Sequence, residues 1–83
     1  MDLLKITRAE YQDRYRVQLW FNNGEVRIAD LSESFVGPVF EPLRDVQYFK
    51  NFQIVYNTLQ WENGADFAPE YLYEISLPIK SII

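Results

Sequence analysis

Three acidic side chains in the last quarter of the chain have a spacing that suggests chemistry. Asp66, Glu70 and Glu74 recur every four residues, a spacing that places side chains on one face of a helix. Such a face suggests a divalent metal site, but these ions need several converging oxygen ligands, and the spacing of a calcium loop is absent. We therefore expect no metal and no cofactor, and we interpret the acidic residues as a solvated face.

The residue types that most often perform catalysis are missing. The chain of 83 residues has no His and no Cys, and it has no Gly-rich phosphate loop and no nucleophile elbow. Paired carboxylates alone can support hydrolysis, but a domain of this size rarely has a cleft that desolvates them. Asp30 is a candidate carboxylate, although we prefer a role as cap of the turn at Leu31-Ser32. The sequence thus predicts no enzyme and no catalytic residue, with a hydrolase as the least favoured alternative.

The charge balance argues against direct contact with nucleic acid. Eight basic and twelve acidic side chains give a net charge of −4, whereas phosphate backbones are bound by clustered Lys and Arg. Lys5, Trp20 and Arg27 are predicted to be neighbours on one sheet face, which suggests a small anion or nucleic-acid platform. We prefer a solvated face there, with a cation stacked on the tryptophan.

Composition also bears on the compartment. A secreted domain this small often needs disulfides, which a chain without Cys cannot form. The first five residues lack the features of a signal peptide, and no apolar run approaches the roughly 20 residues of a membrane span. We expect a cytoplasmic protein with no membrane partner.

The first third of the chain is predicted to form β-strands, which help to position these residues. Apolar residues alternate with polar ones in the first third of the chain, which predicts half-buried strands. An Asn23-Gly24 pair favours a two-residue hairpin turn, which pairs Phe21 with Val26 and Leu19 with Ile28. All four side chains then lie on one apolar face, so the turn and the alternation agree.

The first strand is predicted to pair with the second through a turn at Gln12-Asp13. That turn places Ile6 opposite Leu19 and Leu4 opposite Phe21, which extends the apolar face to three strands.

The rest of the chain predicts short helices and a second hairpin. One helical turn is expected within 31–36, with Ser32 as N-cap, and helices are expected over 42–50 and 69–74. A turn at Tyr56-Asn57 predicts a hairpin between 52 and 61. The whole chain, 1–83, is thus predicted to be a single α+β domain: a three-stranded meander plus a hairpin, with one or two short helices. The expected core residues are Leu19, Phe21, Ile28, Ile54, Leu59 and Trp61.

Two longer stretches carry a resemblance to a known family. They are Gly37 to Leu43 and the gapless block from Trp61 to Tyr73. Together with the turn at 21–24 and with Asp30-Leu31, these stretches resemble the domain-of-unknown-function family DUF2442. The resemblance covers about residues 3–73. The resemblance implies a small α+β fold without assigned catalytic residues in short bacterial proteins. Some longer members carry a C-terminal helix-turn-helix, and short members are often encoded beside a small putative toxin, which implies an antitoxin-like role. Because the sequence ends at Ile83, we expect no DNA-reading helix of the kind that the longer members carry.

The predicted function is therefore a protein-interaction module, an antitoxin-like or accessory partner of another bacterial protein. A DNA-binding transcriptional regulator is the alternative. The block at 61–73 is interpreted either as a partner loop or, preferably, as turn and cap structure in which Asp66 accepts the N–H of Ala68. The candidate partner-binding residues are Trp61, Asn63, Asp66, Glu70, Leu77 and Ile79.

The last residues suggest a second contact surface. Leu77 and Ile79 alternate with Pro78 and Lys80, which predicts an extended segment, and a proline restricts that segment to a sheet edge or face. It either covers the chain's own sheet or docks on a second copy or another protein. We favour a weak homodimer that includes this segment.

Overall fold

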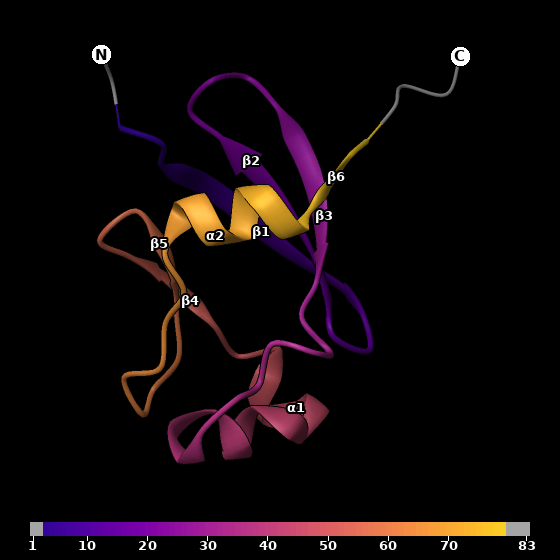
Figure 1. Ribbon diagram of the computed structural model, residues 1–83, viewed down its shortest axis with the longest axis vertical. Helices are drawn as coiled ribbons and strands as arrows, with labels where there is room; N and C mark the ends of the chain where they lie inside the picture. Colours follow the sequence, from indigo (N-terminus) through magenta and orange to yellow (C-terminus); the bar gives the residue numbers. More distant parts are fainter. Residues whose placement is uncertain (1–2, 80–83) are drawn as a thin grey trace.

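The fold is a four-stranded antiparallel sheet with a helix across one face and a small hairpin beside it (Figure 1). The computed structural model describes residues 3–79. The sheet has the order β1-β2-β3-β6, formed by β1 (Ile6–Asp13), β2 (Arg16–Phe21), β3 (Val26–Asp30) and β6 (Leu77–Pro78). The hairpin is formed by β4 (Gln53–Val55) and β5 (Thr58–Gln60), and the helical segments are η1 (Pro38–Arg44), α1 (Val46–Phe49) and α2 (Pro69–Ile75). The predicted α+β class is confirmed.

The hairpin between β2 and β3 forms, but its predicted register is wrong by one residue. Leu19 lies opposite Arg27 instead of Ile28, because the turn has three residues and places Gly24 at φ 90°, a left-handed conformation that glycine adopts without strain. Asn22 is held in this turn by the N-terminal segment. Its side chain accepts the N–H of Lys5 at 2.9 Å and donates to the carbonyl of Leu3 at 2.8 Å.

This one-residue slip moves every side chain of β3 to the opposite face of the sheet. Ala29 is buried in the core, whereas Ile28 is only half-buried and lies on the other face. The prediction that Ile28 belongs to the core is therefore wrong. The predicted neighbourhood of Lys5, Trp20 and Arg27 is also wrong, because Trp20 and Arg27 point to opposite faces.

The turn between β1 and β2 lies two residues later than predicted. Asp13 pairs with Arg16 and Ile6 with Phe21, with register shifts along the ladder. The turn residues are therefore Arg14, at φ 48°, and Tyr15. Contacts with core residues hold Tyr15 in this position, because its ring packs edge-on against Phe35 and Phe49.

The helix predicted over 42–50 is divided in two. Asp45 has an extended backbone (φ −80°, ψ 116°), and its carboxylate accepts the N–H of Gln47 at 3.0 Å. It therefore caps α1 and ends η1, in the way that an N-cap aspartate does. The segment at 31–36 forms a turn rather than a helix, and Asp30 caps that turn by accepting the N–H of Ser32 at 3.0 Å, as we preferred.

The prediction of the second hairpin is confirmed. Ile54 pairs with Leu59, and both turn residues, Tyr56 and Asn57, have positive φ angles of 52° and 70°, as a type I′ turn requires. Leu59 is buried, but Ile54 is 39% exposed, so its placement in the core was wrong.

The core lies between the sheet and α2, the hairpin and the helical segments. The predicted members Leu19, Phe21, Leu59 and Trp61 are all buried, and they are joined by residues that the prediction did not include, among them Ile6, Val17, Leu31, Leu43, Phe49 and Leu72. Helix α2 crosses the core face of the sheet (Figure 1), and the ring of Tyr73 packs edge-on against Phe21. The opposite face of the sheet, which we call the outer sheet face, carries Trp20, Val26 and Ile28.

Candidate functional site

Trp61, the first of the predicted partner-binding residues, lies in the core. Its ring stacks on Phe49 and contacts Phe52 and Phe67 edge-on. Its indole N–H donates to the carbonyl of Phe49 at 2.6 Å, which gives the one polar atom of the side chain a partner. The side chain therefore stabilises the fold and presents almost no surface to a partner.

Asn63 organises the loop that precedes α2. Its side-chain oxygen accepts the N–H of Ala65 at 3.1 Å, and its amide donates to the carbonyl of Val39 at 2.8 Å. The side chain thus builds an Asx-turn and ties that turn to η1. Asp66 lies in a short bridge to Gln60, and the expected bond from Ala68 to its carboxylate is absent from the described residues.

We predict different effects for two substitutions in this loop. Asn63→Ala removes two hydrogen bonds and should lower the free energy of unfolding by about 1–2 kcal/mol. Asp66→Ala removes an exposed side chain and should change it by less than about 0.5 kcal/mol. Urea titrations of the two variants check this. A larger loss for Asp66→Ala than for Asn63→Ala would contradict the assignment of the turn to Asn63.

Glu70 lies exposed in the first turn of α2. That position is favourable for a carboxylate, because the N-terminal end of a helix carries partial positive charge. Within residues 3–79, no group of three or more acidic side chains is placed to hold a metal ion.

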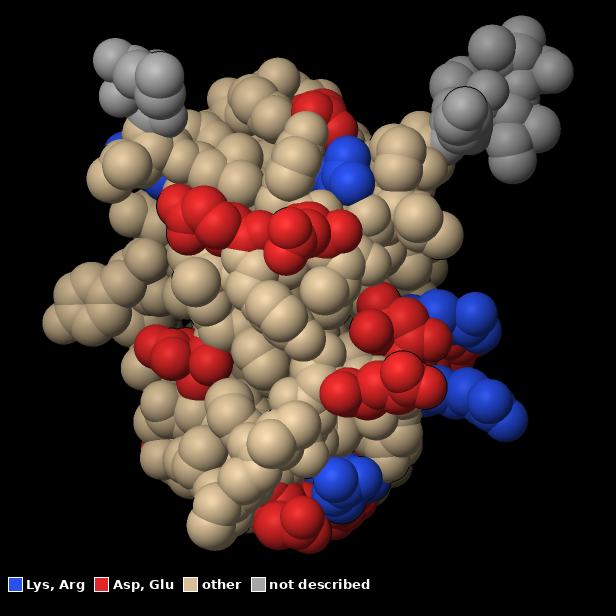
Figure 2. All heavy atoms as spheres, viewed as in Figure 1, with Lys and Arg blue, Asp and Glu red and all other residues tan. Residues whose placement is uncertain are grey.

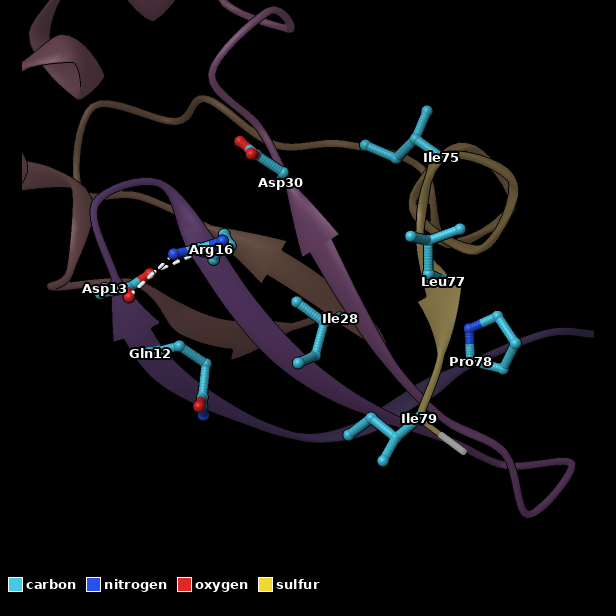
Figure 3. A pocket seen from close by; sticks show the side chains of 9 residues that line it. All are labelled: Gln12, Asp13, Arg16, Ile28, Asp30, Ile75, Leu77, Pro78 and Ile79. Atoms are coloured by element: carbon cyan, nitrogen blue, oxygen red, sulfur yellow. Dashed lines mark hydrogen bonds and ion pairs between the residues drawn. The ribbon is translucent and has the colours of Figure 1, made fainter. Parts of the chain in front are cut away.

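The remaining two predicted residues, Leu77 and Ile79, come together with Ile28 on the outer sheet face. Leu77 pairs with Ile28, and the N–H of Ile79 donates to the carbonyl of Val26 at 2.9 Å. Leu77 is 73% and Ile79 is 40% exposed. Figure 3 shows the three side chains beside a groove of about 610 Å³, with Gln12 and the Asp13–Arg16 pair on its far side.

A second groove continues this surface toward the turn between β2 and β3. It has a volume of about 430 Å³, and its lining includes Trp20 and Val26 together with the polar side chains of Gln18 and Glu25. It shares Pro78 and Ile79 with the first groove. The guanidinium of Arg8 lies 4.6 Å from the centre of the Trp20 ring and borders the surface. The outer sheet face therefore carries one continuous apolar strip from Trp20 to Leu77.

The free edge of β6 is blocked against further strand pairing. Because the N–H of Ile79 points toward β3, the backbone of Pro78 points away from β3, since successive residues of a strand alternate in this respect. Proline has no N–H to offer. A partner strand would meet no donor at Pro78, so strand addition at this edge is disfavoured, whereas the side chains of the outer sheet face stay accessible.

The charges on the outer sheet face are paired with one another. Arg8 forms an ion pair with Glu10, and Arg16 contacts Asp13 through two hydrogen bonds of 2.7 and 2.9 Å. The hydrogen bond from Arg16 holds the pKa of Asp13 below its usual value. By contrast, acidic side chains are spread across the face that α2 crosses (Figure 2).

A polar cluster fixes α2, and with it β6, against the sheet. Arg27 donates to the side chain and the carbonyl of Ser76 at 2.7 and 2.8 Å and to Glu25 at 2.7 Å. The guanidinium also lies 4.1 Å from the centre of the Tyr73 ring, and the Tyr73 hydroxyl bonds to Glu25. Hydrogen bonds from Tyr73 and then Arg27 lower the pKa of Glu25. The sequence prediction missed this cluster because it placed Arg27 on the solvated face.

The fold and this surface define a small α+β domain with one sheet face covered by a helix and one that no helix within residues 3–79 covers. The chain belongs to the family described as "Protein of unknown function (DUF2442)", whose model matches residues 6–78. No curated protein and no solved structure matches the chain. In the part of the chain that the structure describes, no helix is both long enough and apolar enough to span a membrane.

Proposed function

We propose that this chain is a protein-binding module without catalytic activity and that the outer sheet face is its binding surface. The observation that carries the proposal is the apolar strip of Figure 3, where Ile28, Leu77 and Ile79 lie on a sheet face that no described helix covers. Exposed apolar surface with a polar border is typical of protein interaction sites. The charge pairs Arg8–Glu10 and Asp13–Arg16 provide that border here.

The resemblance to short family members supports a specific form of this proposal. In that form the chain is an antitoxin-like or accessory partner of another bacterial protein, and it acts in the cytoplasm. A strip of apolar side chains on a rigid sheet suits such a role, because little conformational freedom is lost when a pre-formed surface binds.

The two alternative functions have less support. Within residues 3–79 the helices are short, and acidic side chains are spread across the face that carries α2 (Figure 2). A DNA-binding regulator needs a basic patch and a reading element. A carboxylate-based hydrolase needs paired carboxylates in a desolvated site. Asp13 and Asp30 both line the larger groove, but both are exposed; Asp13 is bonded to Arg16 and Asp30 to the N–H of Ser32.

Co-purification from the native host with two matched variants tests the proposal. Leu77→Glu places a charge in the apolar strip, and Val36→Glu places the same charge at an apolar residue of equal exposure elsewhere, since Leu77 is 73% and Val36 is 77% exposed. We expect a partner that is retained by the wild type and by Val36→Glu and lost by Leu77→Glu. Equal retention by both variants would remove the outer sheet face as the binding surface.

A further inference from the structure

We infer that the outer sheet face also binds a second copy of this chain, so that two sheets pack face to face. The inference rests on the proposed function, because it names one occupant of the same surface. The apolar strip of Trp20, Val26, Ile28, Leu77 and Ile79 is then shared between the two copies around a two-fold axis. A two-fold interface uses the same surface on both subunits, so the surface must be compatible with itself.

Charge is the first argument for a second copy. The chain has a net charge of −4, so two copies repel each other through most of their surfaces. On the outer sheet face, however, Arg8 is paired with Glu10 and Arg16 with Asp13, and Asp30 is bonded to the N–H of Ser32. This face therefore combines apolar area with nearly balanced charge.

The excess acidic side chains lie on and near α2, away from the outer sheet face. Glu70 and Glu74 belong to α2, on the opposite side of the sheet, and Glu62 and Asp66 belong to the segment that leads into it. Like charges that face each other across an interface weaken it. The outer sheet face is thus a surface where self-association meets little repulsion.

The structure of the β6 edge determines how the two copies can pack against each other. Pro78 offers no N–H at the free edge of β6, so the two copies cannot extend one sheet by pairing β6 with β6 through that residue. Face-to-face packing uses the side chains instead, and packed sheets lie roughly 10 Å apart.

The size of the face predicts a weak dimer. Six residues of β2 span about 20 Å, and four strands span about 14 Å across the sheet, which gives a footprint on the order of 300 Å². A standard interface buries about 800 Å² per partner. We therefore expect dissociation in the range of about 10 µM to 1 mM.

Sedimentation and nuclear magnetic resonance over this concentration range test the inference. The two tryptophans are internal probes, because Trp20 lies on the outer sheet face and Trp61 is bonded in the core. We expect a monomer–dimer equilibrium in which the indole N–H signal of Trp20 shifts with concentration and that of Trp61 does not. Leu77→Glu should raise the dissociation constant at least about tenfold, because it places like charges in the shared strip, and Val36→Glu should leave it unchanged.

Three outcomes would overturn the inference: a wild type that stays monomeric at about 1 mM, a Trp20 signal that does not move, or equal weakening by both variants. These results are separable from the co-purification test. A monomeric wild type whose partner is lost only in Leu77→Glu keeps the proposed binding surface and removes the second copy as its occupant. A monomeric wild type with no such partner removes both.

Discussion

Phe49→Ala is expected to lower the free energy of unfolding by about 3–5 kcal/mol. Phe49 is fully buried, and its ring contacts four others, those of Tyr11, Tyr15, Phe35 and Trp61. Truncation removes these contacts and leaves a cavity that the surrounding rings fill only in part. Because a domain of this kind has a net stability of about 5–15 kcal/mol, the variant should be close to unfolding at physiological temperature.

Urea unfolding followed by circular dichroism measures this loss, and Tyr56→Ala is the matched control. Tyr56 is also aromatic, but it lies at the tip of the β4–β5 turn and is 89% exposed. Its truncation should change the free energy of unfolding by less than about 0.5 kcal/mol. If Phe49→Ala loses no more than the control, the ring cluster around α1 is not the centre of the core.

Arg27→Met is expected to lower the free energy of unfolding by about 2–3 kcal/mol. The methionine keeps much of the apolar stem but loses the hydrogen bonds to Ser76 and to Glu25. Ser76 is buried and Arg27 is largely buried, so water does not fully replace these bonds. We also expect weaker attachment of β6, because Ser76 immediately precedes Leu77.

Hydrogen exchange and acid titration distinguish this effect from a general loss of stability. The amide of Ile79, which bonds to Val26, should lose more protection than amides between β1 and β2. The lowered pKa of Glu25 contributes stability that is present above the usual carboxyl pKa and is lost as the pH falls through the folded value. That loss should be smaller in Arg27→Met. Arg16→Met, which breaks an exposed ion pair, should lose much less stability than Arg27→Met, because water screens and replaces exposed ion pairs.

The β4–β5 hairpin shows where local sequence was sufficient to determine structure. Its turn at Tyr56-Asn57 and its pairing of Ile54 with Leu59 followed from turn chemistry and alternation. The start of α2 at Pro69 also followed, because proline fixes its own backbone angle. The exclusion of the last segment from a central strand followed as well, because proline has no N–H to donate. The cap at Asp30 is equally local, since it bonds two residues away.

The register of the first two hairpins shows where local sequence was not sufficient. Asn23-Gly24 permits a two-residue turn, but Asn22 is bonded to Leu3 and Lys5 in the N-terminal segment, and the three-residue turn results. Likewise, the turn at Tyr15 comes later than predicted because the half-buried Tyr15 ring packs edge-on against Phe35 and Phe49. Contacts between residues far apart in sequence decided both registers.

Sequence by itself determined the fold class, the family, the β4–β5 hairpin and the start of α2, because alternation, turn residues and proline act over a few neighbours. Tertiary structure alone decided which face of β3 is buried, because a one-residue change of register exchanges the two faces of a strand. That exchange moved Ile28 out of the predicted core and Val26 off the predicted apolar face, and it joined both with Leu77 and Ile79. It also moved Arg27 inward to bind Ser76. The outer sheet face therefore exists only as a consequence of the three-dimensional packing.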